Sequence, residues 1–446
     1  MTRNIQRRDV IKGVGAVGVA GLAGCTTEEP DDDGADDTNG VDDTGEPDVS
    51  APDAVMIVGF PQSGIQLFRD YYGEFADDHE DLQIIVPDGL IDSDLPGEVD
   101  NPMNNVTGTA PATDGPGAEF FAEAYEDAYD SAPGVFNAQA YDAMAVTVLA
   151  TVAAGETSGT EIRDRMRTVA NPNGEEFTPE TLTEALETVA AGDPINYQGA
   201  SSSVDFDING DMRAVSYDII DFEDGELNTI DTIDFVAEEN DEEGPAEDPV
   251  GVDSIEAEVG ILMPETGDLG PLGGPIRDAA LLAADQINDA DVDVTVNTQV
   301  EDTQTDPQVG ISGANALVNA GFPAVVGPAA SNVNFQVTEQ VFIPNSVVGI
   351  SPSSTAPGVT DLDDNGFIFR TAPSDALQGP VMAEVVLDQL GASSTGTLFL
   401  NDDYGQALEE SYAAGFEERG GEVRNRVSFE PEQPSYSSQW TEVLDV

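Results

Sequence analysis

From residue 51 onward, short apolar runs alternate with longer segments in which apolar residues recur at helical spacing. Residues 55–58 form such a run and are followed by a helical pattern over 65–76, and residues 397–400 precede a helical pattern over 408–419. Short buried strands that alternate with amphipathic helices are typical of parallel sheets with helices on both faces. The pattern therefore predicts an α/β fold.

Two polar segments interrupt this alternation. Residues 26–50 are rich in Asp, Thr and Gly and contain no aromatic residue, which is typical of a flexible tether. Residues 237–252 form a second acidic linker. A chain of 446 residues is long enough for more than one folding unit, and the second linker divides it into two parts of similar size.

The first 25 residues have the features of an export signal. Arg7 and Arg8 form a twin-arginine pair ahead of Lys12, and a small-residue apolar stretch over 13–23 is too short to span a bilayer comfortably. The stretch ends in LAGC, which resembles a lipobox and whose Cys25 is the chain's single cysteine. We expect lipidation of Cys25 and anchoring on the outer face of the cell membrane. The GxGxxG string at 13–18 follows no strand and lies inside this signal, so it is not a cofactor loop.

The charge balance is extremely acidic. The chain carries 88 Asp and Glu against 14 Lys and Arg, a formal net charge of −74, and Lys12 is its only lysine. Repulsion on this scale destabilises a compact domain at moderate ionic strength. Molar salt shortens the Debye length to about 3 Å and screens it. The composition is therefore typical of a protein from an extreme halophile, and it excludes nucleic acid as a partner.

The residue inventory also limits the chemistry. One cysteine and one histidine, His79, leave no intrachain disulfide and support neither a zinc site nor a His-based triad, so an enzyme and a resident cofactor are not predicted. Two strings, DFDINGD at 205–211 and DLDDNG at 361–366, imitate the start of a calcium loop. Their twelfth positions hold Ser216 and Ala372 instead of a bidentate Glu, so no metal site is predicted. The first string is better interpreted as a hairpin with a turn at Asn209 and Gly210.

Five motifs after the second linker occur in a recognisable order. They are VGILMPETG at 259–267, DTQTDP at 302–307, VVGPAAS at 325–331, GISPSST at 349–355 and NDDYG at 401–405. This part resembles the first half of the branched-chain amino-acid (Leu/Ile/Val) binding protein family, which has the type I periplasmic-binding fold. The part before the linker resembles the second half of that family, on the strings PDAVMIVGF at 52–60, YDA at 141–143 and NYQGA at 196–200.

The resemblance implies a two-lobed fold whose halves stand in swapped sequence order. We therefore interpret the chain as a circular permutant in which the acidic linker joins the ancestral termini, since such joins are tolerated at exposed loops. The alternative is a rearranged gene that carries two half-proteins in one frame. The expected division is a signal at 1–25, a tether at 26–50, lobe II parts at 51–113, 203–236 and 374–446, lobe I parts at 114–202 and 253–373, and the linker at 237–252.

The resemblance also implies the binding residues. Ser331 and Thr355 would donate hydroxyl hydrogen bonds to a ligand carboxylate, and the backbone amide of Ser353 would add another; Ser and Thr also commonly cap helices. Asp88 matches the acidic residue that would pair with an α-ammonium, although an aspartate after a strand is ordinary in so acidic a chain. Tyr404 would contact the ligand, or else be a core tyrosine. Apolar side chains would face the ligand's side chain, or simply pack in the core: Phe60, Leu269 and Leu272.

These expectations favour an exported solute-binding lipoprotein that captures an amino acid or similar small molecule for an ABC-type importer. A monomer is expected, with a membrane permease as its partner. A ligand-sensing receptor domain of the same fold is the alternative function, and an enzyme is the third hypothesis. Fold alone does not decide among them.

Overall fold

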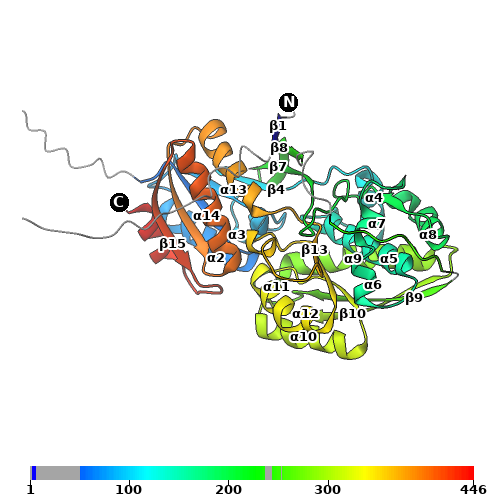
Figure 1. Ribbon diagram of the computed structural model, residues 1–446. Coiled ribbons are helices and arrows are strands. Elements are labelled where there is room, and N and C mark those ends of the chain that lie inside the picture. Colours follow the sequence, from blue (N-terminus) through cyan, green and yellow to red (C-terminus); the bar gives the residue numbers. More distant parts are fainter. Residues whose placement is uncertain (1–2, 7–50, 237–243, 253, 446) are drawn as a thin grey trace, which may run out of the picture.

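The protein is described by a computed structural model that covers residues 3–6, 51–236, 244–252 and 254–445. Its ribbon shows two α/β lobes beside each other (Figure 1). Most of the expected export signal, including Cys25, and the expected tether lie outside the described residues. Among the helices in the described ranges, none is long and apolar enough to cross a membrane.

Lobe II, as we name it, is built on an eight-stranded sheet in the order β1-β8-β7-β4-β3-β2-β14-β15. All neighbouring strands are parallel except that β7 runs antiparallel to both β4 and β8. The strands are β1 (Arg3–Gln6), β2 (Ala54–Val58), β3 (Gln83–Val86), β4 (Val106–Pro111), β7 (Ala214–Glu223), β8 (Glu226–Val236), β14 (Ser394–Leu400) and β15 (Glu422–Phe429). The helices of this lobe are α2 (Pro61–Asp70), α3 (Leu95–Val99), α13 (Asp375–Glu384), α14 (Asp403–Glu418) and α15 (Ser437–Leu444).

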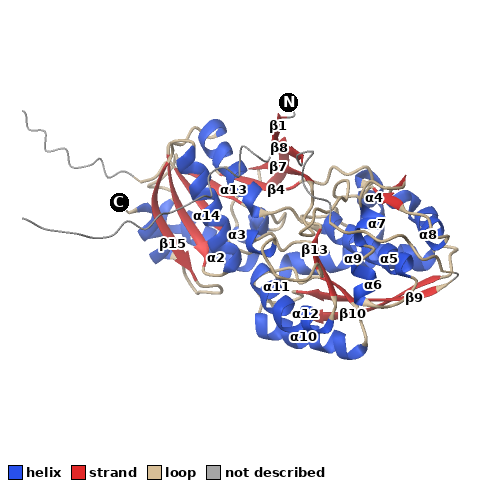
Figure 2. Cartoon of the chain, viewed as in Figure 1, coloured by secondary structure: helices blue, strands red, loops and turns tan. Residues whose placement is uncertain are grey.

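Lobe I is built on a five-stranded, fully parallel sheet in the order β10-β9-β11-β12-β13. Its strands are β9 (Ile255–Met263), β10 (Val294–Asp302), β11 (Ala324–Val326), β12 (Val348–Ser351) and β13 (Ile368–Arg370), and a two-stranded sheet of β5 (Glu175–Phe177) and β6 (Ile195–Tyr197) accompanies them. Its helices are α4 (Ala118–Tyr129), α5 (Asn137–Ala154), α6 (Gly159–Arg163), α7 (Met166–Ala170), α8 (Leu182–Ala190), α9 (Gly270–Asp289), α10 (Pro307–Ala320), α11 (Ser331–Val337) and α12 (Ile343–Asn345). Figure 2 shows these helices around the sheet.

Helix α5 is the centre of lobe I. Every one of its residues is buried, and it packs against α9 and against strands β9, β11 and β12. A helix that is apolar on all sides belongs in a core and not on a surface. Residues 137–154 thus complete a lobe whose sheet comes entirely from residues 255–370.

Each lobe therefore combines segments from both parts of the chain. In lobe II, β2 pairs in parallel with β14, with Ala54 opposite Thr395. The fully buried Trp440 of α15 donates from its indole nitrogen to the carbonyl of Leu67 on α2 at 2.9 Å. These contacts make one core out of residues that are more than 340 positions apart.

The first and last described segments of the two parts lie close together. Arg424 donates to the Ala51 carbonyl at 3.2 Å, and its neighbour Asn425 donates to the Val443 carbonyl at 3.3 Å. A Cβ on Gly396 would meet Val443 at 2.6 Å and Pro52 at 3.5 Å. Position 51 and the end of α15 are thus held by the same strand pair.

The predicted fold class is confirmed: the protein is α/β, with two mostly parallel sheets flanked by helices. The run at 55–58 lies in β2, and the run at 397–400 lies in β14. The helical pattern over 65–76 becomes α2 followed by a π-helical turn at Tyr71–Phe75, and the pattern over 408–419 lies in α14 and its C-cap.

The described part of the acidic linker is ordered against lobe I. Val250 donates its amide to the Ala153 carbonyl at the end of α5, and Val252 donates to the Ala190 carbonyl at the end of α8. Both bonds are 2.8 Å long. The end of the linker therefore packs against the C-terminal ends of α5 and α8 before β9 begins.

Candidate functional site

A narrow pocket lies between the two lobes. The pocket and its opening to solvent together contain about 300 Å³ of space that no atom occupies. The lining residues are Phe60, Asp88, Gly89, Phe136, Leu269, Ile276, Ala329, Ala330, Ser331, Ser353 and Tyr404. Most of them directly follow the carboxyl ends of strands of the two sheets, which is where open α/β sheets bind ligands.

The lobe II wall is a compact polar and aromatic unit. Tyr404, in the first turn of α14, donates its hydroxyl to Asp88 Oδ1 at 3.0 Å, and its ring stacks on that of Phe60 with centroids 5.3 Å apart. Gly89 permits this arrangement, because a Cβ there would lie 2.5 Å from the Gly59 carbonyl and 3.0 Å from the Tyr404 hydroxyl. Three loops, after β2, β3 and β14, thereby meet at Asp88.

Asp88 is poised to receive a hydrogen-bond donor. Asp88 is only 2% exposed, and its second oxygen, Oδ2, has no hydrogen-bond partner among the described residues. Burial raises the pKa of Asp88, and the hydrogen bond from Tyr404 opposes that shift only in part. A buried acceptor without a donor is costly, so a cationic or N–H group that reached Oδ2 would be strongly favoured.

The lobe I wall presents small hydroxyl residues. Ser331 is the first residue of α11, which follows the loop after β11, and its Oγ accepts from the Ser354 hydroxyl and from the Ala356 amide, each at 3.3 Å. Ser353 follows β12 and donates its hydroxyl to the Ala329 carbonyl at 3.3 Å. Both serines line the same pocket as Asp88, so the structure brings these three predicted residues together.

Thr355 has a different neighbour. Its hydroxyl donates to Asp375 Oδ2 at 2.9 Å, and its carbonyl accepts the Asp375 amide at 2.9 Å. Thr355 is 1% exposed and is not among the lining residues. Its hydroxyl proton is therefore committed to Asp375, at the first residue of α13, where the chain passes from lobe I into lobe II.

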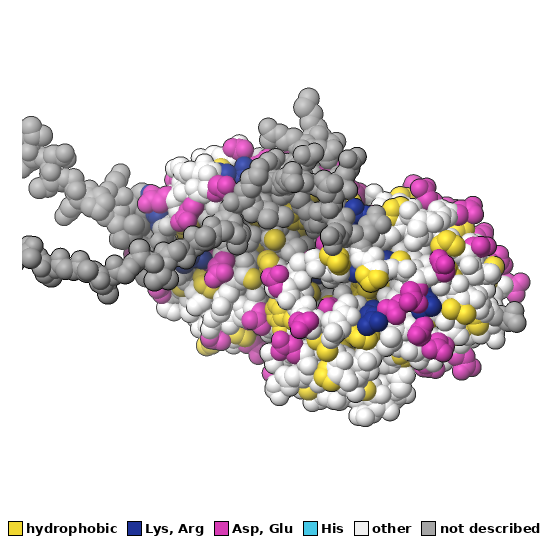
Figure 3. All heavy atoms as spheres, viewed as in Figure 1, with side chains coloured by type: hydrophobic (Ala, Val, Ile, Leu, Met, Phe, Trp, Pro, Cys, Tyr) yellow, Lys and Arg dark blue, Asp and Glu magenta, His cyan; other side chains and the backbone are white. Residues whose placement is uncertain are grey.

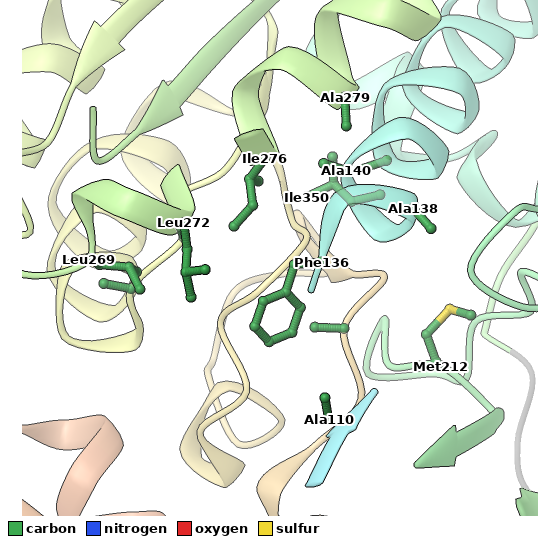
Figure 4. Packing of buried hydrophobic residues seen from close by; sticks show 14 of the residues in the cluster. Ala110, Phe136, Ala138, Ala140, Met212, Leu269, Leu272, Ile276, Ala279 and Ile350 are labelled. Atoms are coloured by element: carbon green, nitrogen blue, oxygen red, sulfur yellow. The ribbon is translucent and has the colours of Figure 1, made fainter. Parts of the chain in front are cut away.

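The apolar part of the pocket differs from the expected set. Leu269 lines it, whereas Leu272 is buried in the adjoining core. Phe136 and Ile276, which no sequence motif indicated, complete the apolar part of the pocket. Figure 4 shows the Phe136 ring between the α9 side chains and Ala110. Phe136 is the N-cap residue of α5 and adopts the left-handed backbone conformation (φ 67°), which its place in the sequence does not indicate.

At the edge of the site, one lobe caps a helix of the other. Helix α2 begins at Pro61, and its N-cap residue, Phe60, makes no side-chain cap. Asp268, in the loop between β9 and α9, accepts instead from the Ser63 amide at 2.7 Å and from the Ser63 hydroxyl at 2.8 Å. Burial raises the pKa of Asp268 to about 6, and the bonds from Ser63 lower it. This contact holds the lobes together beside the pocket.

Arg370, at the end of β13, braces the loop that carries Ser353. It pairs with Asp211 at 2.5 Å and donates to the carbonyls of Ser354 and Ala356 at 3.3 and 3.0 Å. Asp211 belongs to the DFDINGD string, in which the amides of Asn209 and Asp211 both bond to Asp207 Oδ1. In the described ranges, no group of three or more His, Cys, Asp and Glu is placed to hold a metal ion.

Comparison with known proteins finds a family model for the second part of the chain and relatives that match part of it. Residues 256–445 match the family model described as periplasmic binding protein. A leucine-, isoleucine-, valine-, threonine- and alanine-binding protein from Pseudomonas aeruginosa is 29% identical over 169 residues, which are 37% of this chain and 44% of that protein. The chain thus spans less than half the length of such relatives.

Two further matches are of interest. A chemotactic signal transduction system substrate-binding protein from Halobacterium salinarum is 31% identical over 205 residues, covering 38% of this chain and 48% of that protein. The crystal structure of a leucine-binding protein from Thermotoga maritima matches with a TM-score of 0.38 and 22% identity, covering 42% of this chain and 52% of that one. From residue 256 to residue 445, therefore, the chain matches the periplasmic binding protein family, and the relatives of the chain include a protein named for binding leucine, isoleucine and valine.

Proposed function

We propose that this protein captures an α-amino acid with an apolar side chain outside the cytoplasm and delivers it to an ABC-type importer. The observation that carries this proposal is the composition of the pocket. It combines the unpartnered carboxylate oxygen of Asp88, the hydroxyl residues Ser331 and Ser353, and an apolar wall that includes Phe136. An ammonium, a carboxylate and an apolar side chain would each find a complementary surface.

The match to amino-acid-binding relatives supports the same ligand class. Ser331 and Ser353 would receive the carboxylate, with Asp88 on the opposite wall for the ammonium. Tyr404 would orient Asp88, and Phe60 and Leu269 would contact the ligand's side chain. Because Thr355 is bonded to Asp375, its part would be to fix the loop through Asp375.

The chain order forms part of the proposal. The pairing of β2 with β14 and the shared contacts of Ala51 and Val443 support a circular permutation of the family's fold. We also propose anchoring through Cys25 after a twin-arginine signal, and operation in molar salt, on the sequence features given above. Figure 3 shows acidic side chains spread over the face in view, with few basic ones between them.

A second candidate is a sensory binding protein that reports its ligand to a signalling partner. The similarity to a chemotactic signal transduction system substrate-binding protein from Halobacterium salinarum favours this possibility specifically. Both functions need the same capture step, and they differ in the membrane protein that recognises the closed lobes. Co-purification of the lipidated protein with a permease or with a transducer separates the two.

Ligand capture is tested by thermal unfolding in 2–3 M KCl against the twenty amino acids and matched amides, α-keto acids and amines. A true ligand at a hundredfold excess over Kd stabilises the protein by about 2.7 kcal/mol. We expect stabilisation by amino acids with apolar side chains and none by α-keto acids, which lack the ammonium. No response to any amino acid would overturn the proposal.

A further inference from the structure

A second buried carboxylate stands behind Asp88. Asp375, at the start of α13, is fully buried, and its Oδ2 accepts from Thr355, while its Oδ1 has no hydrogen-bond partner in the part of the chain that the structure describes. Asp88 has the complementary pattern, since Oδ1 accepts from Tyr404 and Oδ2 has no partner. Two carboxylates therefore each have one satisfied and one unsatisfied oxygen in the same interior.

Helix α13, which begins at Asp375, packs against the elements that hold Asp88. Ser411 of α14, the helix that also carries Tyr404, donates its hydroxyl to the Asp375 carbonyl at 2.9 Å. Gln378, one turn along α13, donates at 3.0 Å to the carbonyl of Thr109 on β4, the strand that pairs with β3 immediately before Asp88. After burial itself, the charge of Asp88 is the largest influence that raises the pKa of Asp375. The charges of both carboxylates raise the pKa of Tyr404. Gln378 lowers the pKa of Asp88. Two negative charges this near in a dry interior are strongly unfavourable, and one proton between them removes the repulsion.

Positive charge nearby does not remove the need for that proton. Arg370 acts on Asp375 and favours its charged form, but both its Nε and its Nη2 are already bonded to Asp211. The other titratable groups that act on the pair or on Arg370 are the neutral phenols Tyr404 and Tyr217. No Lys or Arg is among the lining residues of the pocket.

We propose that Asp375 is a positioning residue of the binding site, holding a proton on Oδ1 that it donates to Asp88 Oδ2 or shares with it. This inference rests on the proposed capture of an amino acid. It gives the pair a single negative charge, so the site would balance one ammonium and favour zwitterions with one amino group over dications. It also links the ligand's partner, Asp88, to the segment where the chain crosses between lobes, because Asp375 bonds to Thr355 through both its amide and its side chain.

The proposal predicts an unusual pattern among substitutions. Asp375→Asn keeps an acceptor for Thr355 and supplies an N–H donor toward Asp88, so it mimics the protonated acid. We expect its affinity for L-leucine, the probe, to lie within about threefold of the unchanged protein, whereas Asp375→Leu loses roughly tenfold to a hundredfold because the buried donor is missing. Asp388→Asn, an exposed change on the turn after α13, controls for the removal of one charge.

A measurement without ligand separates this proposal from the proposed function. Infrared difference spectra at pH 7 should contain the carbonyl stretch of a protonated, buried carboxylic acid that Asp375→Asn removes and Asp388→Asn retains. A wild-type spectrum at pH 7 with no protonated carboxyl band would overturn the proposal even if Asp375→Asn did not fold. Leucine binding that Asp375→Asn abolishes as completely as Asp88→Asn would overturn it as well, because that result makes Asp375 a second full charge. If leucine does not bind the unchanged protein but the band is present, the choice of ligand fails and the shared proton stands.

Discussion

Among single residues, Asp88 is the one on which recognition depends most directly. Replacing it with Asn keeps an acceptor for Tyr404 but removes the negative charge at Oδ2. We expect Asp88→Asn to weaken binding of an amino acid by roughly 2–5 kcal/mol, the usual cost of truncating one partner of a desolvated charge pair. Isothermal titration in molar KCl measures this loss. Ser331→Ala is the matched change on the opposite wall and should cost less, and an unaltered affinity in Asp88→Asn would remove this residue from the site.

Asp142 is a buried aspartate whose carboxylate stabilises the fold. It is fully buried in α5, and its carboxylate accepts from the Tyr197 hydroxyl, the Ala200 amide, and both the amide and the hydroxyl of Ser201. Asn would turn an N–H toward these donors, so Asp142→Asn should lower the free energy of unfolding by roughly 2–4 kcal/mol. Urea unfolding at constant salt measures it, and a variant as stable as the parent would contradict the proposed role.

The difference in free energy of unfolding between the parent and Asp142→Asn should depend on pH. Burial raises the pKa of Asp142 to about 6, although the hydrogen bonds to its carboxylate lower it. A raised folded-state pKa means that the folded protein holds this proton more tightly than the unfolded chain. The Asp142 contribution to stability therefore grows as the pH falls through 6. Between pH 7 and pH 5 the gap between parent and Asp142→Asn should widen by about 1 kcal/mol.

For single residues, the sequence indicated which ones line the pocket better than it indicated where their side chains point and what they bond to. Six of the pocket-lining residues were expected from the family resemblance: Phe60, Asp88, Leu269, Ser331, Ser353 and Tyr404. Leu272 turned into the core instead, and Phe136 entered the pocket through a left-handed backbone angle that a residue string does not encode. Asp375 could not be singled out, because one aspartate among 88 acids carries no signal until its oxygens are seen to lack partners.

At the scale of elements, helix α2 depends on a cap from the opposite lobe. Its own N-cap residue offers no side-chain acceptor, and Asp268 bonds to its third residue, Ser63, through both the amide and the hydroxyl. Asp268→Ala should therefore remove a helix cap, which costs about 1 kcal/mol, and a lobe-to-lobe contact at the same time. We expect a more open protein without ligand, detected as a larger radius of gyration in small-angle scattering.

A matched variant distinguishes capping from bridging. Ser63→Ala removes the hydroxyl but keeps the amide that Asp268 also binds. Its radius of gyration should stay near that of the parent, while Asp268→Ala shows the expansion. Equal radii for the parent and Asp268→Ala would mean that the lobes are held by other contacts.

For the whole molecule, net charge sets the conditions under which any of these measurements works. With a formal charge of −74, repulsion among carboxylates opposes compactness until salt screens it. We expect the thermal midpoint to rise steeply between 0.1 M and 2 M KCl. A neutral osmolyte at matched osmolality is the control, because it supports burial without screening charge, and an equal gain from the osmolyte would refute the electrostatic explanation.

The order of the segments along the chain is the property of the whole molecule that sequence motifs indicated and that pairing geometry now makes testable. Strand β2 has β14 as a parallel neighbour, and α15 packs on α2 through Trp440, so lobe II needs residues from both parts of the chain. Residues 51–236 alone, or 254–445 alone, should therefore show no cooperative unfolding transition. A reordered chain that joins residue 445 directly to residue 51 and omits the linker should fold, since Arg424 and Asn425 already hold the two ends at one strand.

We expect the reordered chain to have a thermal midpoint within a few degrees of the parent and the same ligand response in the same salt. The physical reason is that every strand pair and helix contact described above is retained, while only one connection is exchanged for another across ends that lie close together. If instead each separate part unfolded cooperatively and the reordered chain failed to fold, the two parts would be independent units. The pocket, which takes Asp88 from one part and Ser331 from the other, would then have no common scaffold.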